Sequence, residues 1–282
     1  MGFIASVEQL VPTLLGRPMR KYLDDKAWRR QQPPLIFDNA NLRCVSDVDL
    51  VTAMNDPVIG AAFAGDLAAI AGVFAASEIA GGVNPGDRRA LYHLIGHFKP
   101  RRILEVGTHV GASTIHIANA LRKFVDQGVL WTVDIVDVNG PEGAWRSLGM
   151  RQPPAGIMSD LGLAPITTFI TAPAARVLEL PDQRFDMIFL DGDHSKFAVY
   201  REISAALRLL NPNGLILLHD FYPDGKPLVP DGNVEFGPAA AATRIASETD
   251  ALAFLPLGKL PWPTKNGGNS TSLALVSKRQ MA

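Results

Sequence analysis

Apolar and polar residues alternate in two different ways along the chain, and the change falls near residue 90. Residues 1–90 show helical patches punctuated by proline and no clear strand. Beyond them, short apolar runs predict strands over 102–106, 129–135, 166–171, 185–190, 214–218, 252–257 and 270–276. Between these runs, apolar residues at helical spacing predict helices over 87–98, 113–125 and 195–210. Asp87 is the expected N-cap of the first helix, and N-P-N-G ends the last one with a turn.

Strands that alternate with helices predict an open α/β fold, with a mainly parallel sheet covered by helices on both faces. About seven strands are expected, and the last two, close in sequence, form an antiparallel hairpin. We therefore divide the chain into a helical N-terminal segment, residues 1–86, and an α/β domain, residues 87–282.

Composition narrows the class of partner. The net charge of −1 and the lack of a basic stripe interleaved with aromatic residues argue against nucleic acid and anionic membranes. The most apolar stretch, residues 57–80, holds Asp66 and is dominated by alanine and glycine, which favours a packed internal helix over a membrane span. The N-terminus does not have the pattern of a signal peptide. Cys44 is the only cysteine, which fits a cytoplasmic protein without disulfides.

Four acids stand where predicted parallel strands end: Glu105, Asp134, Asp191 and Asp220. Ligands of open α/β sheets bind at that edge, so a shared site is expected there. The alternative is that each acid caps the helix that follows its strand. Four such acids on one predicted edge favour the shared site.

The turn after the first of these strands reads G-T-H-V-G-A-S, from Gly107 to Ser113. It lacks the lysine of a P-loop and the second glycine of a dinucleotide fingerprint, so it is not a phosphate cradle. Gly107 and Gly111 still allow the backbone to approach a ligand closely. Glu105 beside this turn suits an ammonium or sulfonium group, and Asp134 stands where a ribose diol would be bound.

At this point E-V-G-T-H-V-G-A-S resembles motif I of class I S-adenosylmethionine-dependent methyltransferases. L-D-G-D-H-S at 190–195 and N-P-N-G-L-I-L-L-H-D-F at 211–221 resemble the later motifs of the catechol-type and macrolide-sugar-type O-methyltransferases. The similarity runs from about residue 87 to the C-terminus. It implies a Rossmann-like fold and methyl transfer from S-adenosylmethionine, most simply to a hydroxyl of a small phenolic, sugar or natural-product-like acceptor.

The resemblance also implies residue roles. Glu105, Gly107 and Gly111 would line the methionine half of S-adenosylmethionine, and Ser113 would hold its carboxylate. Asp134 would bind the ribose, and Ala172 lies where the adenine edge is read. The cofactor-binding set predicted in full is Glu105, Gly107, Thr108, His109, Gly111, Ser113, Asp134, Ala172 and Asp191.

Metal-dependent relatives bind a divalent ion with the acid that ends strand four and two polar residues that end strand five. The corresponding residues here are Asp191 and either His219-Asp220 or Asp220-Phe221. The first pair puts a histidine in place of an oxygen donor, and the second lacks a ligand. We predict a site for magnesium, manganese or a similar divalent metal ion at Asp191, His219 and Asp220.

For the general base, the loop after strand four offers His194 and Asp193. A histidine has an intrinsic pKa suited to abstracting a proton near neutral pH, although His194 could instead bond backbone at a helix start. Asp193 could equally be a metal ligand or a helix cap. His93 and His97, four apart on one predicted helix, are assigned to a solvated face.

The loop 221–238 is long and rich in proline and glycine, and we expect Phe221 and Tyr222 to contact the acceptor. Residues 1–86 would cover the acceptor site or form a dimer contact. Three alternatives stay open: N-methylation, a non-catalytic protein that binds S-adenosylmethionine, and a nicotinamide oxidoreductase.

Overall fold

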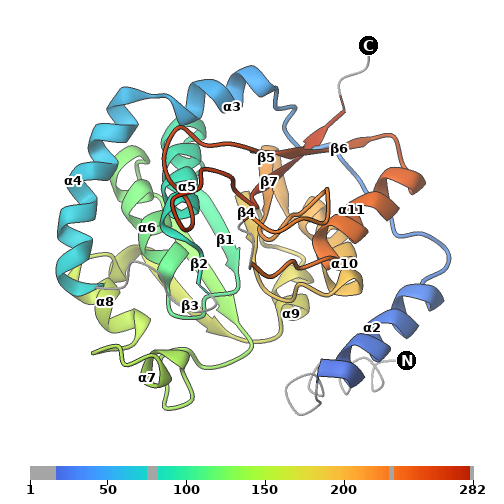
Figure 1. Ribbon diagram of the computed structural model, residues 1–282, viewed down its shortest axis with the longest axis horizontal. Coiled ribbons are helices and arrows are strands. Elements are labelled where there is room, and N and C mark those ends of the chain that lie inside the picture. Colours follow the sequence, from blue (N-terminus) through green and yellow to red (C-terminus); the bar gives the residue numbers. More distant parts are fainter. Residues whose placement is uncertain (1–16, 75–81, 229–231, 280–282) are drawn as a thin grey trace.

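A seven-stranded sheet forms the centre of the computed structural model, which describes residues 17–74, 82–228 and 232–279 (Figure 1). The strand order is β3-β2-β1-β4-β5-β7-β6. The strands are β1 (Arg102–Val106), β2 (Val129–Asp134), β3 (Thr167–Thr171), β4 (Phe185–Leu190), β5 (Leu210–Leu218), β6 (Leu252–Pro256) and β7 (Ala274–Lys278). β1 to β5 pair in parallel, whereas β7 pairs antiparallel with both β5 and β6. The predicted open α/β fold with an antiparallel C-terminal hairpin is confirmed.

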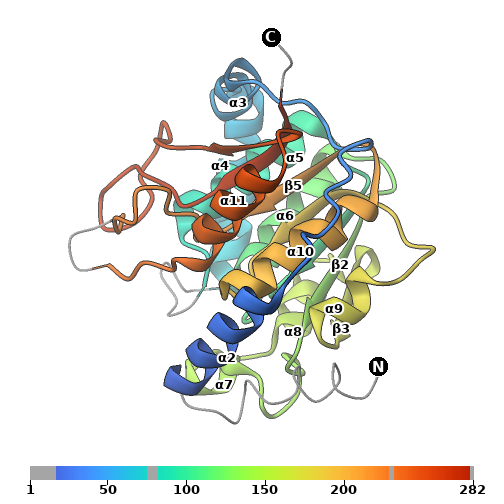
Figure 2. The ribbon, with the colours of Figure 1, turned by 90° about the vertical axis from the view of Figure 1, so that its right-hand side faces the viewer.

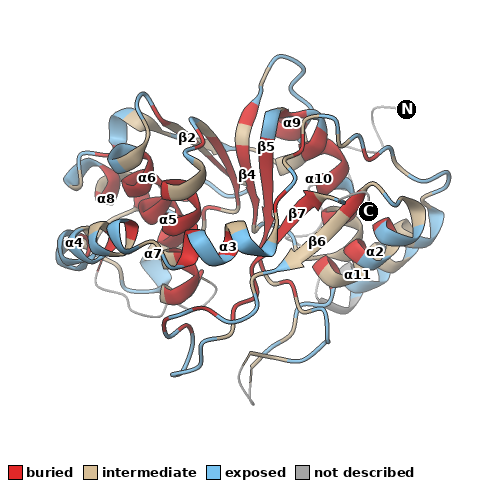
Figure 3. Ribbon diagram, turned by 90° about the horizontal axis from the view of Figure 1, so that it is seen from above, coloured by how far each residue is buried: buried red, intermediate tan, exposed pale blue. Residues whose placement is uncertain are grey.

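Helices cover both faces of the sheet (Figures 2 and 3). One core cluster includes side chains of α3, α4, α5, α6 and α8, and the other includes side chains of α9, α10 and α11. The helices are α2 (Arg17–Arg30), α3 (Asp47–Met54), α4 (Pro57–Val73), α5 (Pro85–Phe98), α6 (Ala112–Phe124), α7 (Ala144–Ser147), α8 (Pro154–Asp160), α9 (Ala174–Leu178), α10 (Lys196–Arg208) and α11 (Gly237–Glu248), with a short 3-10 turn, η2 (Ala164–Ile166).

The sequence prediction is wrong at the start of β5. We expected N-P-N-G to be a turn before a strand at 214, but the strand begins at Leu210 and includes these residues. The pairing with β4 shifts register between Phe185 and Met187, and Asn213 has φ 62°. The breaker residues are therefore accommodated as an irregularity within the strand instead of ending it.

The start of α5 also differs from the prediction. Asn84, not Asp87, is the N-cap, and its side chain accepts from the Asp87 backbone N–H. Asp87 lies one turn into the helix and is fully buried. Its carboxylate is therefore available for contacts with the sheet edge instead of for capping.

The N-terminal segment divides between the two faces of the sheet. α2 packs on α10, where Asp24 accepts from the Phe197 backbone N–H at 2.9 Å and Asp25 pairs with Lys196. α3 and α4 pack on α5, on the opposite face. Residues 1–16 and 75–81, on which the signal-peptide and apolar-stretch predictions partly rest, lie outside the described residues.

Among the described helices, none taken singly has the length and apolarity to cross a membrane. The bent pair α3 and α4 meets the criterion by length and composition alone.

Candidate active site

The carboxyl ends of β2, β1, β4 and β5 lie next to one another in the sheet, so the four acids predicted to share an edge end neighbouring strands. Asp191 follows β4, with its backbone N–H bonded to Val106 O at the end of β1. His219 follows β5, with its backbone N–H bonded to Leu190 O. These ladder bonds extend the strands and hold the site residues at the edge.

Glu105 is fully buried near the end of β1, surrounded by hydroxyls. The hydroxyls of Thr114 and Thr132 both donate to Oε2, at 2.6 and 2.7 Å, while Oε1 has no hydrogen-bond partner. Burial raises the pKa of Glu105 to about 7, opposed by the hydroxyls of Ser113, Thr114 and Thr132. An unpartnered buried carboxylate oxygen is expensive, so Oε1 suits a ligand that donates to it.

Asp134 ends β2 and holds the motif I turn. Its Oδ2 accepts from the backbone N–H groups of Thr108 and His109, at 3.1 and 2.9 Å. Its Oδ1 accepts from Val136 N at 3.1 Å. A carboxylate has about four lone-pair sites, so roughly one acceptor position remains for a ligand. Ala172, after β3, donates its N–H to the backbone carbonyl of Asp134 and so lies beside that residue.

The motif I turn itself depends on glycine. Gly107 has φ 97°, and a Cβ there would lie 2.1 Å from Asp191 O, so only glycine lets the β1 and β4 turns touch. Gly111 has φ 76° and precedes the first residue of α6. His109 has φ 50°, and its buried Nδ1 has no hydrogen-bond partner. The turn thus brings its backbone against the turn that follows β4.

The strand-four and strand-five residues form a tight cluster of charge. His219 Nδ1 lies 2.9 Å from Asp191 Oδ1 and 3.5 Å from Asp220 Oδ1. His194 Nε2 lies 3.8 Å from Asp191 Oδ1 and 3.5 Å from Asp220 Oδ2. One ligand atom from each of Asp191, His219 and Asp220 lies within 4.8 Å of the others, as a metal ion would require.

Asp87 holds the far side of the His219 ring, a contact that the sequence analysis missed. Its Oδ2 lies 3.3 Å from His219 Nε2 and accepts from the Asn84 side chain at 2.7 Å. Burial lowers the pKa of His219, but Asp191, Asp220 and Asp87 outweigh burial and raise it well above its usual value. Asp87 and His219 are 132 residues apart, so no local pattern could have joined them.

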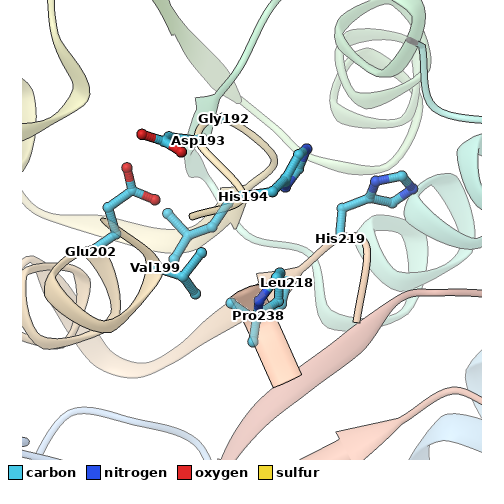
Figure 4. A pocket seen from close by; sticks show the side chains of 9 residues that line it. Gly192, Asp193, His194, Val199, Glu202, Leu218, His219 and Pro238 are labelled. Carbon is cyan, nitrogen blue, oxygen red and sulfur yellow. The ribbon is translucent and has the colours of Figure 1, made fainter. Parts of the chain in front are cut away.

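His194 and Asp193 point to opposite sides of their loop. Figure 4 shows the His194 ring on the side that faces His219, whereas Asp193 lies near Glu202 of α10. The exposed Asp193 accepts from Ser195 N at 2.8 Å, which stabilises the turn before α10. The structure therefore brings His194, and not Asp193, to Asp191 and Asp220.

Loop 221–238 has one residue that the sequence analysis placed wrongly. Phe221 is buried, and its ring stacks on Phe254 of β6, so it is part of the core instead of facing an acceptor. Tyr222 donates its hydroxyl to Asp220 Oδ1 at 3.1 Å. Residues 229–231 lie outside the described residues. The loop leads into α11, where a Cβ on Gly237 would lie 1.8 Å from His194 O, so α11 packs directly on the His194 loop.

Comparison with known proteins gives a consistent result. Residues 104–221 match the family model described as a methyltransferase domain. A protein of Mycolicibacterium smegmatis assigned as an O-methyltransferase is 30% identical over 187 residues, which cover 64% of this chain and 80% of that protein. The catechol O-methyltransferase of Mycobacterium tuberculosis is 25% identical over 219 residues, or 73% of this chain and 90% of that protein.

Solved structures show the same fold. The O-methyltransferase TomG of Streptomyces achromogenes, in complex with SAM, aligns with a TM-score of 0.51 at 19% identity, over 87% of this chain and 100% of that chain. An O-methyltransferase of Bacillus cereus in complex with SAH gives a TM-score of 0.50 at 17% identity, over 83% and 98% of the two chains. The chain belongs to the O-methyltransferase family, as its motifs predicted.

Proposed function

We propose that the protein transfers the methyl group of S-adenosylmethionine to a hydroxyl of a small molecule, with His194 as the general base. The observation that carries this proposal is the meeting of His194, Asp191, Asp220 and His219 at the ends of β4 and β5, within 3.8 Å contacts. These charges lie beside the motif I turn, because Gly107 touches the Asp191 backbone. The site for the methyl donor would therefore lie next to the site for the methyl acceptor.

The residues present fit S-adenosylmethionine. The unpartnered Glu105 Oε1 suits the ammonium group of its methionine half, and Asp134 retains an acceptor position for a ribose hydroxyl. Ser113 and Thr108, both buried, would line the turn, and Ala172 would lie towards the adenine. When bound, the cofactor supplies a methyl group on a positively charged sulfur, which the surrounding carboxylates favour electrostatically.

The chain's own contribution is to orient the acceptor and to accept its proton. An alcohol or phenol is mostly protonated at neutral pH, so a base must remove the proton as the new bond to carbon forms. His194 Nε2 lies 3.8 Å from Asp191 Oδ1 and 3.5 Å from Asp220 Oδ2, so we take it as the ring nitrogen that accepts this proton. Aligned placement of the reacting groups supplies up to ~7–11 kcal/mol of the rate enhancement in intramolecular analogues.

A divalent ion also fits this site. Cis ligands of an octahedral ion lie roughly 3 Å apart at ordinary metal–ligand distances, close to the 2.9 Å between His219 Nδ1 and Asp191 Oδ1. These two atoms are in direct contact, and an ion bound between them would replace that contact. We propose Asp191, His219 and Asp220 as ligands, with the imidazole favouring manganese, iron or zinc over magnesium. Such an ion would lower the pKa of a bound acceptor hydroxyl.

The test is methyl transfer by the purified full-length chain to matched panels of phenols, sugars and amines. We expect transfer to a hydroxyl panel member, lowered by EDTA and restored by Mn²⁺ more than by Mg²⁺. Transfer to amines alone would show an N-methyltransferase. Binding of S-adenosylmethionine measured by calorimetry, with no turnover on any acceptor, would favour a non-catalytic protein.

For the N-terminal segment, we propose both roles suggested by its position. α2 lies against α10 beside the His194 loop, which supports a role in covering the acceptor side. The outer face of α3 and α4 exposes Val48, Val51 and Val58 by 63–73%, which supports a homodimer contact. Light scattering of the wild type and a Val51→Asp, Val58→Asp variant tests the dimer. The exposed, unpaired Cys44 fits the cytoplasm as the proposed location.

A further inference from the structure

A cavity lies between the start of α4, the middle of α5 and the connection from β6 to β7. In Figure 1 that connection passes over α5. The volume of the cavity is about 320 Å³, and its lining includes Asp56, Gly60, Arg89, His93 and Trp262. The methyl-transfer site contributes no residue to this lining. The cavity is large enough for a metabolite of modest size.

His93 is the first sign that this cavity is built for a ligand. The residue is 1% exposed, although we predicted a solvated face for it, and that prediction is wrong. Its Nδ1 lies 3.0 Å from Ala53 O, which makes Nδ1 the hydrogen-bond donor. Nε2 is buried without a partner and is turned towards Gly60, where a Cβ would lie 4.0 Å away. An acceptor nitrogen without a donor therefore faces the cavity.

Arg89, one helical turn before His93 on α5, supplies a positive charge and hydrogen-bond donors. Its guanidinium lies 4.2 Å from the centre of the Trp262 ring and 5.5 Å from that of Phe63. Its Nε is buried without a partner, and an Nη lies 3.5 Å from the position of a Gly60 Cβ. Stacking on two rings holds the fork of the guanidinium in one orientation, which suits a planar anion.

Trp262 fixes the floor of the cavity. Its Nε1 donates to Gly86 O at 2.9 Å, and its ring packs against the imidazole of His93 at 4.7 Å. At the rim, Asp56 caps α4 by accepting from the backbone N–H groups of Val58 and Ile59. Asp56 adds a negative charge that balances Arg89, so the cavity disfavours polyanions and favours a ligand of small net charge.

We propose that this cavity binds a small carboxylate that carries a hydroxyl or ammonium group on the neighbouring carbon. The carboxylate pairs with the Arg89 fork, and the donor group bonds to His93 Nε2. An ammonium group is additionally attracted by Asp56. The site is independent of the methyl-transfer chemistry, because it shares no lining residue with it and its ligand need not be methylated.

The experiment uses the full chain and the probes lactate, glycine, acetate and inorganic phosphate, with binding measured by calorimetry and by intrinsic tryptophan fluorescence. We expect lactate and glycine to bind in the millimolar range, each about fivefold or more tighter than acetate, which lacks the donor. Phosphate is expected to bind more weakly than lactate. Equal affinity for lactate and acetate, or tighter binding of phosphate, overturns the proposal.

Variants assign the contacts. Arg89→Met should weaken lactate binding by ~10–100-fold, whereas Arg151→Met, which removes an exposed arginine, should leave it unchanged. His93→Asn should remove the preference for lactate over acetate. Unchanged binding of S-adenosylmethionine reports that each variant is folded. If Arg89→Met does not fold, Arg89→Lys is measured in its place. Lactate affinity that is the same in wild type and in the folded Arg89 variant overturns the proposal.

Discussion

The two halves of the sheet edge hold their carboxylates in opposite ways. On the β1–β2 side, Glu105 and Asp134 accept hydrogen bonds from hydroxyl and backbone N–H groups of the chain itself. On the β4–β5 side, Asp191 and Asp220 lie against the imidazoles of His194 and His219. Asp220 also accepts from the hydroxyls of Tyr222 and Ser272, but imidazoles are the groups that both carboxylates share. The β1–β2 side is therefore held in a fixed shape by hydrogen bonds. The β4–β5 side is a cluster of charged groups suited to binding a cation or to transferring a proton.

This difference separates positioning from chemistry. The donors around Glu105 and Asp134 are uncharged, so they fix the shape of the motif I turn and leave the two carboxylates without a charged partner. That side is therefore suited to binding. The imidazoles among carboxylates on the other side can accept a proton, and the same set can ligate an ion. Variants on the first side should therefore change affinity for the cofactor, and variants on the second should change turnover.

The largest effect is expected from His194→Gln, which removes the proposed base. Turnover should fall by ~10²–10⁴-fold, because general base catalysis commonly contributes that much. Affinity for S-adenosylmethionine should not change. Steady-state kinetics with the best acceptor, together with calorimetry, would measure both.

Asp193→Asn is the matched control for the same loop. Because Asp193 is exposed and bonds only the turn at Ser195, turnover should stay within a few-fold of wild type. A large loss with Asp193→Asn and none with His194→Gln would reverse our assignment of the base.

Gly107→Ala should act mainly on the binding side. The new Cβ would lie 2.1 Å from Asp191 O at a φ of 97°, so the β1 and β4 turns must separate. We expect cofactor affinity to drop at least about tenfold and the melting temperature to fall. Gly149→Ala is the control, since Gly149 has φ 68° with no atom within 4 Å of the added Cβ. If both variants behave alike, backbone strain alone explains the effect and the contact is unimportant.

Asp87→Asn tests how the charged cluster is positioned. The amide keeps the shape but weakens the hold on His219 Nε2, so affinity for Mn²⁺ should fall by ~10–100-fold. Paramagnetic resonance of the bound ion measures this without any methyl transfer. Asp126→Asn, at an exposed position, should leave Mn²⁺ binding unchanged. Wild-type Mn²⁺ affinity in Asp87→Asn would rule out a positioning role for Asp87.

The smallest effect is a pH dependence on the cradle side. Burial raises the pKa of Glu105 to about 7, and a cationic ligand binds best to the ionised form. Cofactor affinity should therefore fall by up to ~10-fold as the pH drops one unit below that value, and level off above it. Glu105→Gln should bind more weakly and show no such change. The same shift makes the ligand-free protein less stable as the pH rises from 4.5 to about 7, because the folded state retains a proton that the unfolded chain releases.

Strands with an uninterrupted apolar run could be predicted from the sequence with their bounds. β1 and β4 begin and end where the apolar residues do, because both faces of each strand are covered. The prediction for β5 is too short, since N-P-N-G reads as a breaker unless the partner strand is known to tolerate a bulge. α11 was missed, although its buried Ala241, Ala242 and Ile245 have helical spacing, because it begins with Gly237-Pro238 at the end of a stretch that reads as a loop.

The clustering of the candidate site residues was predictable where polar residues follow a strand end. His219, Asp220 and Asp191 could be found that way, since topology alone brings the ends of parallel strands together. The distant contact partner of a buried group could not be predicted from the sequence. Nothing local distinguishes Asp87 as a contact of His219 from a helix cap, and nothing marks His93 as buried, because α5 is covered on both sides.

The docking of α2 has a practical consequence for anyone who shortens this protein. Asp24 accepts from the Phe197 backbone N–H, in the first turn of α10, and Arg244 of α11 donates to Trp28 O and Gln31 O. A version that starts after residue 31 would leave those groups to water right next to the loop that carries the proposed base. Deletion would then resemble a catalytic lesion while the central sheet stayed intact, and an inactive truncated sample would say nothing about the activity of the full-length chain.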